Sequence, residues 1–467
     1  MWINFDPNSN LPITRQLYDK IKEMILDAKL TPKDKLPSTR VLASELKISR
    51  NTVLEVYNKL IAEGYLEARH GSGTIVSDSI TMLQKQIREH NNDNRVKNIR
   101  KEEKLINFRS GVPDLNLFPR KEWGRLYQRL CKDLPSSALR YQSPCGVYEL
   151  REAISNYLYR TRGISCAAQN IMIVSGSTQG LSLISALLYR DQQEVITEDP
   201  LHPGLLQVIT SAGYHIKGIP VDEKGMITDL LAPSEHLSFL YTTPSHQYPM
   251  GGILPLQRRI ALIQYAVSQN CYIIEDDYDS EFRFEGQPTN SLYELNPSKV
   301  IYLGSFSKIL APAIRIGFLI LPKELQDQYK TLKMYSDVHT EALSQYTLAE
   351  FIQNGDLEKH IWRMKKLYNH KREHLIKELK MNFDGQYEIL GQAAGLHIVI
   401  KFNNIIFTEE LIRKLTTHHV KIYPVEDYTI RKSGSYSNQI ILGYAHLTFT
   451  EITEGVKILR DVIKILT

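Results

Sequence analysis

The segment Val300-Ile-Tyr-Leu-Gly-Ser-Phe-Ser-Lys308 places a lysine just after an apolar run. The run predicts a buried strand, and burial disfavours the cationic form of a lysine and lowers its pKa. A neutral amine can form a Schiff base with an aldehyde. The hydroxyls of Ser305 and Ser307, with Arg315 seven residues after Lys308, suit a phosphate group. Because Ser-x-x-Lys is a common pattern, a cofactor site here needs support from other segments.

An acidic segment follows a second apolar run, at Ile273-Ile-Glu-Asp-Asp-Tyr-Asp279. Acidic residues that come directly after a buried parallel strand lie at its carboxyl end, where α/β sheets bind ligands. A carboxylate there can hold a pyridinium nitrogen protonated, and a phenol can bond a ring hydroxyl. Taken alone, the segment is also compatible with a magnesium site or a solvated loop.

A third segment, Val174-Ser-Gly-Ser-Thr-Gln-Gly180, predicts a strand that runs into a helix. The small residues Ser175, Gly176 and Ser177 at this helix start let backbone amides and hydroxyls approach a phosphate. An ordinary helix cap is the alternative.

The pattern of apolar and polar residues divides the chain into three zones. Residues 106–467 alternate short apolar runs with helical patterns, which predicts an α/β domain with a mainly parallel sheet covered on both faces. Residues 78–105 are polar and predict a linker. Residues 1–77 have a compact helical pattern. We therefore expect two folded domains, 1–77 and 106–467, joined by residues 78–105.

Composition excludes several classes of protein. The chain has 467 residues, of which 42% are hydrophobic and 23% charged, and its net charge of +5 does not by itself indicate a nucleic-acid partner. It has no run of about 18 apolar residues and no secretory signal pattern. Its four cysteines make no CxxC pair and have no histidine nearby at zinc-ligand spacing. We expect a cytoplasmic protein with reduced thiols, no metal site and no membrane partner.

The first zone has the pattern of a helix-turn-helix followed by a hairpin. Apolar residues recur at helical spacing between Ile13 and Ile25, and Ser38 and Ser49 are placed as N-caps of two further helices. In the helix after Ser38, the pattern directs Val41 inward, with Leu42 and Leu46. His70-Gly-Ser-Gly73 separates two short strand-like runs, which predicts a β-hairpin wing.

Such a module would read DNA with the N-terminal end of its second helix, where Arg50, Asn51 and Thr52 reach base edges or phosphates. Further predicted DNA contacts lie at the helix starts and on the wing, at Ser38, Thr39, Arg40, Ser49, Arg69, His70 and Gly71. A small helical adaptor without DNA contact is the alternative, because the charges of this zone nearly balance.

Four strings in this zone, in order, resemble the winged-helix domain of GntR-type bacterial repressors: Leu36–Arg40, Ser49–Val53, Glu63–Leu66 and Gly71–Thr74. The order of the three segments in residues 106–467 resembles fold type I pyridoxal 5′-phosphate (PLP) enzymes of the aspartate aminotransferase group. Together, the two zones resemble the MocR/GabR subfamily of GntR regulators. The resemblance implies a winged helix, a linker, and an aminotransferase-like domain with a smaller C-terminal α+β part.

The resemblance also implies roles for individual residues. Lys308 would hold PLP as an internal aldimine, Asp276 would pair with the pyridine nitrogen and Tyr278 with the ring hydroxyl. His202 would stack on the ring, and His246 would lie near the ring hydroxyl. The phosphate would be bound by Ser177, Thr178, Ser305, Ser307 and Arg315, and by Tyr141 across a dimer interface.

Two positions depart from the transaminase pattern. Transaminases have asparagine before the proline of a turn that reads Tyr248-Pro-Met-Gly251 here, so one hydrogen bond to the ring is missing or is supplied by His246. They also carry an arginine for the substrate carboxylate where Ile441 stands, and isoleucine cannot donate that bidentate pair. Arg431, in the preceding loop, is a candidate effector-binding substitute, with a solvated loop arginine as the alternative.

The resemblance therefore implies a homodimeric, PLP-dependent transcription regulator. Its large domain would sense an amine as an external aldimine, with at most a transamination half-reaction, and control binding to a double-stranded DNA operator. An active aminotransferase with an accessory DNA-binding domain and a sensor of PLP itself stay open. As the effector, D-alanyl-D-alanine or another amine is favoured over γ-aminobutyrate. Regulators that respond to γ-aminobutyrate bind its carboxylate with an arginine, and the segment after His202 lacks that arginine.

Overall fold

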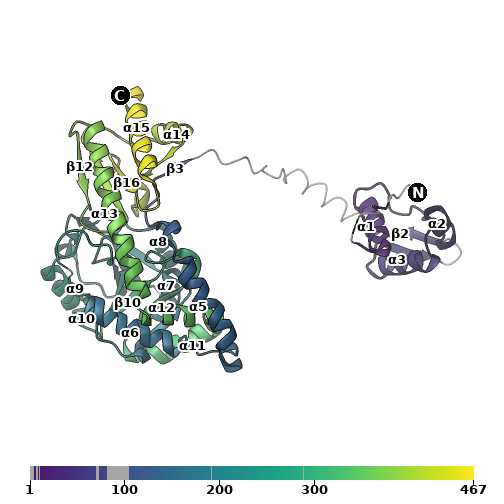
Figure 1. The fold of residues 1–467 in the computed structure, drawn as a ribbon, viewed down its shortest axis with the longest axis horizontal. Helices are drawn as coiled ribbons and strands as arrows, with labels where there is room; N and C mark the ends of the chain where they lie inside the picture. Colours follow the sequence, from purple (N-terminus) through teal and green to yellow (C-terminus); the bar gives the residue numbers. More distant parts are fainter. Residues whose placement is uncertain are drawn as a thin grey trace. The chain divides into compact units, whose positions relative to one another are not determined.

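The computed structural model describes residues 5–6, 9, 11–69, 73–80, 105–190, 192–287 and 289–466. The chain forms two compact units that divide near residue 102 (Figure 1). None of the helices found among these residues is long and apolar enough to span a bilayer. The four cysteines are free.

The N-terminal unit consists of three helices followed by a hairpin. Its elements are α1 (Ile13–Leu26), α2 (Thr39–Leu46), α3 (Arg50–Ala62), β1 (Leu66–Arg69) and β2 (Gly73–Val76). Ser38 Oγ accepts a hydrogen bond from Val41 N at 3.3 Å, and Ser49 Oγ accepts one from Asn51 N at 3.2 Å, so both serines cap their helices. β1 and β2 pair antiparallel. This is the predicted helix-turn-helix with its hairpin.

A single apolar cluster holds this unit together. Leu17 of α1 packs with Val53 of α3, and Ile80, beyond the hairpin, belongs to the same cluster. The sequence pattern was wrong about Val41, which is 49% exposed. Leu42 and Ala43 face the core, and Val41, which lies about 100° around the helix from Leu42 on the side away from Ala43, points outward.

The C-terminal unit is built on an eight-stranded sheet of order β4-β11-β10-β9-β8-β5-β6-β7. Strands β10, β9, β8, β5 and β6 run parallel to one another, whereas β11 and β7 are antiparallel to their neighbours. The predicted mainly parallel sheet is confirmed. The strands are β4 (Ile171–Val174), β5 (Glu194–Asp199), β6 (His215–Asp222), β7 (Gly225–Met226), β8 (Leu237–Thr242), β9 (Tyr272–Asp277), β10 (Val300–Ser305) and β11 (Gly317–Ile320).

Successive residues of these strands enter two different cores. Ile273 and Val300 belong to one apolar cluster, and the next residues, Ile274 and Ile301, belong to another. Helices cover both faces, which is why the strands are continuous apolar runs. Residues of α6 (Tyr148–Arg162), α9 (Leu256–Ser268) and α12 (Ala342–Gln353) enter the first cluster, and residues of α7 (Ser177–Leu188), α8 (Pro203–Ser211) and α11 (Gln326–Asp337) enter the second.

A smaller antiparallel sheet, of order β12-β13-β16-β15, belongs to the same unit. Its strands are β12 (Tyr387–Leu390), β13 (His397–Phe402), β15 (Tyr423–Pro424) and β16 (Gln439–Gly443), and its helices are α14 (Glu409–Thr417) and α15 (Phe449–Leu466). β3 (Ile106–Asn107) pairs with β14 (Val420–Lys421), so the start of the unit docks beside this sheet. The long helix α13 (Asp356–Asn382) runs from the large sheet's helices toward the smaller sheet (Figure 1).

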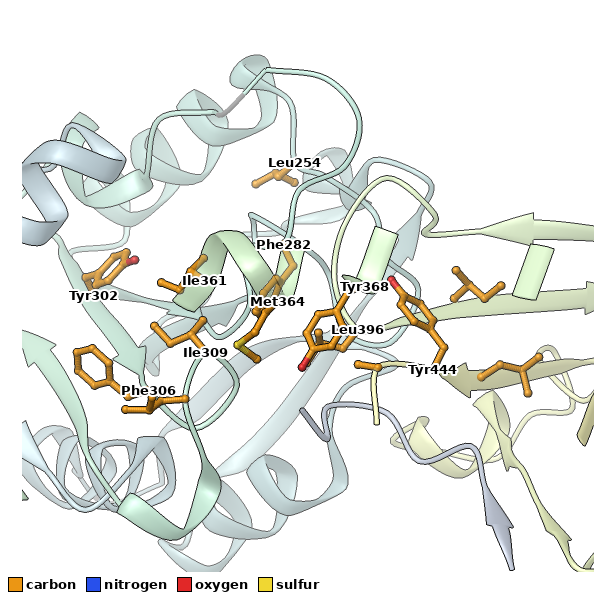
Figure 2. Close-up of a cluster of buried hydrophobic side chains, with 14 of the residues drawn as sticks. Leu254, Phe282, Tyr302, Phe306, Ile309, Ile361, Met364, Tyr368, Leu396 and Tyr444 are labelled. Carbon is orange, nitrogen blue, oxygen red and sulfur yellow. The ribbon is translucent and has the colours of Figure 1, made fainter. Parts of the chain in front are cut away.

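The core that joins these parts also anchors the lysine motif. Phe306 and Ile309 flank Lys308 in the sequence, and both lie in the same buried cluster as Met364 and Tyr368 of α13 (Figure 2). The backbone on either side of Lys308 is therefore fixed by packing.

Candidate functional site

The carboxyl ends of neighbouring strands open into one cavity of about 280 Å³. β9 and β10 pair in parallel with Asp276 opposite Leu303, so the aspartate and the segment that leads to Lys308 reach the same edge of the sheet. The wall residues come from loops far apart in the sequence. They are Ser110, Gly111, Ser177, Thr178, His202, Gly204, Leu205, Tyr241, Thr243, Tyr248, Asp276, Tyr278, Ser305, Ser307, Lys308, Pro312 and Arg315.

Lys308 projects its amine into this cavity. Burial lowers the pKa of Lys308, the charges of Asp279 and Asp276 oppose that shift, and Arg109 and Arg315 lower the pKa further. Gly111, with φ of +67°, leaves room for the amine: a Cβ there would lie 3.2 Å from Nζ. A partly desolvated amine with a lowered pKa is suited to nucleophilic attack on a carbonyl carbon.

Asp276 is held in one orientation. Tyr241 on β8 donates a 2.6 Å hydrogen bond to Oδ2, and Oδ1 is buried without a partner. Burial raises the pKa of Asp276 to about 7, although the bond from Tyr241 and the charge of Lys308 oppose the shift. A cationic or N–H group from a ligand would satisfy the free oxygen and favour the carboxylate.

The three aspartates of this segment have three different partners. Tyr241 bonds Asp276, Arg162 pairs with Asp277 at 2.8 Å, and His246 pairs with Asp279 at 3.0 Å. Their side chains do not converge. In the part of the chain that the structure describes, no group of three acidic, histidine or cysteine side chains could hold a metal.

Tyr278 is backed by a buried histidine–carboxylate pair. His246 Nδ1 lies 2.9 Å from the Tyr278 hydroxyl and 3.0 Å from Asp279 Oδ2. Gly395 makes room for this pair, because a Cβ there would lie 2.1 Å from His246 Cε1. A carboxylate can only accept, so Nδ1 carries the hydrogen, and the phenol keeps its own hydrogen for the cavity. His246 thus lies behind Tyr278 and does not line the cavity.

An anion site closes one end of the cavity. Helix α7 begins at Ser177 and has no side-chain cap, and its N-cap Gly176 has φ of +90°. The Arg315 guanidinium donates a hydrogen bond to the Ser175 carbonyl. Gly176 leaves room for this guanidinium, because a Cβ there would lie 2.6 Å from Arg315 Nη2. Free amides at a helix start, nearby hydroxyls and a guanidinium make a binding site for a phosphate.

His202 and Tyr248 bound the other end. Their ring centroids are 5.4 Å apart, and Tyr248 shares a 2.6 Å hydrogen bond with Ser110. Loss of solvent around the ring and the charges of Lys308 and Arg109 lower the pKa of His202. Its Nδ1 accepts from Gly204 N at 3.0 Å, so the neutral ring carries its hydrogen on Nε2.

Most of the residues predicted for the cofactor line this one cavity: Ser177, Thr178, His202, Asp276, Tyr278, Ser305, Ser307, Lys308 and Arg315. The two other residues predicted for the cofactor, His246 and Tyr141, do not line it, and neither does the predicted effector residue Arg431. Tyr141 is 87% exposed, in a surface hollow with Leu139 and His339. Arg431 is exposed and is not among the wall residues.

Sequence reasoning missed Tyr241, Tyr248, Ser110 and Gly111 in the cavity wall, and Arg109 beside it. Tyr241 ends the apolar run Phe239-Leu-Tyr241, which predicts a strand and does not by itself indicate a ligand contact. The polar and glycine residues of Ser110-Gly111 after a strand-like run were the signal that could have identified the latter segment.

The N-terminal unit presents its predicted DNA-contacting residues on α2, α3 and the hairpin. Arg50 and Asn51 are exposed at the start of α3, and Arg50 Nε is 3.5 Å from Thr39 Oγ1 at the start of α2. Thr52 is half-buried. Ser38, Arg40, Ser49 and Arg69 are exposed. His70 and Gly71 lie outside the described residues.

The residues of the cavity fit PLP. The unpartnered Asp276 oxygen suits a protonated ring nitrogen, the Tyr278 hydroxyl suits the ring oxygen, and Lys308 suits the aldehyde. The anion site at α7 suits the phosphate. All four requirements meet in one cavity of suitable size.

Comparison with known proteins agrees with this description. Residues 103–459 match aminotransferase class I and II, and residues 13–76 match bacterial regulatory proteins of the gntR family. The chain is 33% identical to the uncharacterized HTH-type transcriptional regulator YdeL of Bacillus subtilis over 98% of each chain. It is 32% identical to the probable rhizopine catabolism regulatory protein MocR of Rhizobium meliloti, over 98% of this chain and 94% of that one.

Among solved structures, an archaeal alanine:glyoxylate aminotransferase superposes with a TM-score of 0.73 and 29% identity, covering 79% of this chain and 92% of that one. Aminotransferases of this family depend on PLP, and the match covers the unit that holds Lys308 and Asp276. The chain belongs to the MocR-like GntR-family transcription regulators, in which a GntR helix-turn-helix domain precedes an aminotransferase class I and II domain.

Proposed function

We propose that this protein is a PLP-dependent transcription regulator. Residues 1–77 bind a double-stranded DNA operator, residues 106–467 bind PLP and an amine effector, and residues 78–105 link the two. One observation carries the proposal: the amine of Lys308 and a buried, unpartnered oxygen of Asp276 share a cavity, in a chain that also has a capped recognition helix.

Different residues of the cavity would bind different groups of PLP. PLP, when bound, supplies an aldehyde carbon that amines can attack. Asp276 holds a proton at the ring nitrogen, and Tyr278 donates its hydrogen toward the ring oxygen. His202 covers one face of the ring. Arg315, the start of α7 and the hydroxyls of Ser177, Thr178, Ser305 and Ser307 hold the phosphate.

We further propose that the protein acts as a homodimer, in which Tyr141 of one protomer reaches the phosphate of the other. Its high exposure in a single chain is consistent with this role. A dimer presents two winged helices, and therefore reads two half-sites of an operator.

An active aminotransferase is the second candidate function, favoured by the intact Lys308–Asp276 pair. Ile441 argues against it. This side chain has no exposed surface and packs with Val399 and Val425, so the strand offers no cation to a substrate carboxylate. A sensor of PLP itself would use the same cofactor residues, and experiment separates it from an amine sensor.

The test is the visible absorbance of the full-length protein with PLP, followed by titration with amines that include γ-aminobutyrate, D-alanine and D-alanyl-D-alanine. Lys308→Ala is the control for covalent attachment. We expect a Lys308-dependent band that one amine shifts without accumulation of a keto product. Many turnovers with an added keto acid would establish the aminotransferase instead. A band that no amine shifts, with operator affinity set by PLP alone, would identify a PLP sensor.

A further inference from the structure

The guanidinium of Arg109 belongs to a segment beside the cavity and has no hydrogen bond or ion pair with another described residue. Arg109 directly precedes Ser110 and Gly111, which both line the cavity. Its side chain is exposed, and among the residues that the structure describes none forms a hydrogen bond or ion pair with the guanidinium. A free guanidinium next to a ligand cavity is available to an anionic group of the ligand.

The backbone that carries Arg109 is held on both sides. Phe108 N donates to the Lys421 carbonyl at 2.9 Å, and Gly443 N donates to the Phe108 carbonyl at 2.9 Å. A Cβ on Gly443 would lie 2.1 Å from the Arg109 carbonyl oxygen, so the segment docks closely on the end of β16. On the other side, Ser110 Oγ is bonded to the Tyr248 hydroxyl at 2.6 Å. These contacts therefore hold the backbone of Arg109, and with it the Cα from which the side chain extends, in one position.

The segment that carries Arg109 lies at the His202 end of the cavity, because Ser110 bonds Tyr248, whose ring centroid is 5.4 Å from that of His202. The charge of Arg109 adds to the effect of burial in lowering the pKa of Lys308 and of His202. The same charge opposes the rise in pKa that burial causes at the phenols of Tyr248 and Tyr428. These electrostatic effects agree with a guanidinium on this side of the cavity. Arg315 is tied to the Ser175 carbonyl at the α7 end. The charges of Arg109 and Arg315 both lower the pKa of the Lys308 amine.

We propose that Arg109 binds the carboxylate of the effector and so makes the protein specific for an amino acid or peptide over a simple amine. The proposal rests on the proposed function. β16 buries Ile441 where the transaminase pattern has an arginine, and the segment docked on the end of that strand supplies a cation instead. Its planar fork can donate two hydrogen bonds to one carboxylate.

The test uses two stable ligands that differ by one carboxylate: N-(5′-phosphopyridoxyl)alanine, as each enantiomer, and N-(5′-phosphopyridoxyl)ethylamine. Calorimetry measures their binding to the cofactor-free, full-length protein. We expect the tighter alanine ligand to bind the wild type about 10- to 100-fold better than the ethylamine ligand. Arg109→Gln should bring that ratio close to one, Arg109→Lys should give an intermediate ratio, and Arg431→Gln should leave it at the wild-type value.

The ratio distinguishes a carboxylate contact from a structural role. An unchanged ratio in Arg109→Gln overturns the proposal, as does an equal loss of affinity for both ligands or a loss of preference that follows Arg431. A wild-type protein without preference for the carboxylate also overturns it. If neither ligand binds the wild type while it still binds DNA, the proposed cofactor site itself fails, and this inference fails with it.

Discussion

Tyr241 fixes the orientation of Asp276 by bonding one of its carboxylate oxygens at 2.6 Å and leaving the other buried and unpartnered. The two residues lie on neighbouring parallel strands, β8 and β9. The unpartnered oxygen, Oδ1, is therefore available to a hydrogen-bond donor of a ligand. A carboxyl with a pKa raised to about 7 gains most from a cationic partner, because that partner restores the charged form that burial disfavours.

We expect Asp276→Asn to change the pH dependence of stability in the cofactor-free protein. The pKa of Asp276 rises from 3.8 to about 7 on folding, so this carboxyl destabilises the folded state increasingly as pH rises through that range. Relative to wild type, the variant should gain about 2–3 kcal/mol of stability between pH 5 and pH 8. Thermal unfolding at four pH values measures the difference, with Asp461→Asn as an exposed control. Parallel wild-type and variant curves would refute this account of Asp276.

The pair of His246 and Asp279 should show strong energetic coupling. Each side chain is about 1% exposed, so removal of one leaves the other buried without its partner. We expect His246→Ala and Asp279→Ala each to lower the free energy of unfolding by about 3 kcal/mol or more. The double variant should lose about 1–3 kcal/mol less than the sum. Urea unfolding of the four proteins measures the coupling, and strict additivity would contradict it.

Restoring the transaminase arginine should fail. Ile441 packs in an apolar cluster with Val399 and Val425, so Ile441→Arg buries an unpaired charge. We expect a loss of stability above about 3 kcal/mol and no gain in transamination, with Ile441→Leu as the isosteric control. Thermal unfolding and a keto-acid assay measure the two quantities. A stable variant with new turnover would mean that the cavity reaches Ile441.

Arg50→Ala should weaken operator binding by about 1–3 kcal/mol if Arg50 makes a bidentate contact with a base. Arg50 is exposed at the start of α3, where a recognition helix enters the major groove. Fluorescence anisotropy with labelled operator measures the effect. Arg15→Ala removes an exposed arginine that pairs with Asp19 on α1 and serves as the matched control. An unchanged dissociation constant and sequence preference would remove Arg50 from the contact surface.

The sequence predicted much of the cavity because its chemistry follows strand ends. Lys308, Asp276 and Ser177 each follow an apolar run within a few residues, and the carboxyl ends of parallel strands meet at one edge of a sheet. The caps Ser38 and Ser49 were predictable for a similar reason, because capping depends on residues close in the sequence.

What the sequence did not predict depends on contacts between distant segments. Tyr241 reaches Asp276 because β8 lies next to β9, and periodicity gives the face of a residue but not its neighbouring strand. Arg109 comes beside the cavity through the docking of residues 106–111 against β14 and β16, and Ser110 of that segment bonds Tyr248. The roles of Arg431 and Tyr141 stay predictions, because both are exposed in a single chain.

The most direct test of the central claim is operator affinity measured by fluorescence anisotropy with and without PLP and the amine that shifts its band. If the cavity controls DNA binding, the ligands should change the dissociation constant of the wild type by at least about fivefold, and they should leave Lys308→Ala unchanged. The same dissociation constant in all conditions would contradict a regulator that reads its effector through Lys308.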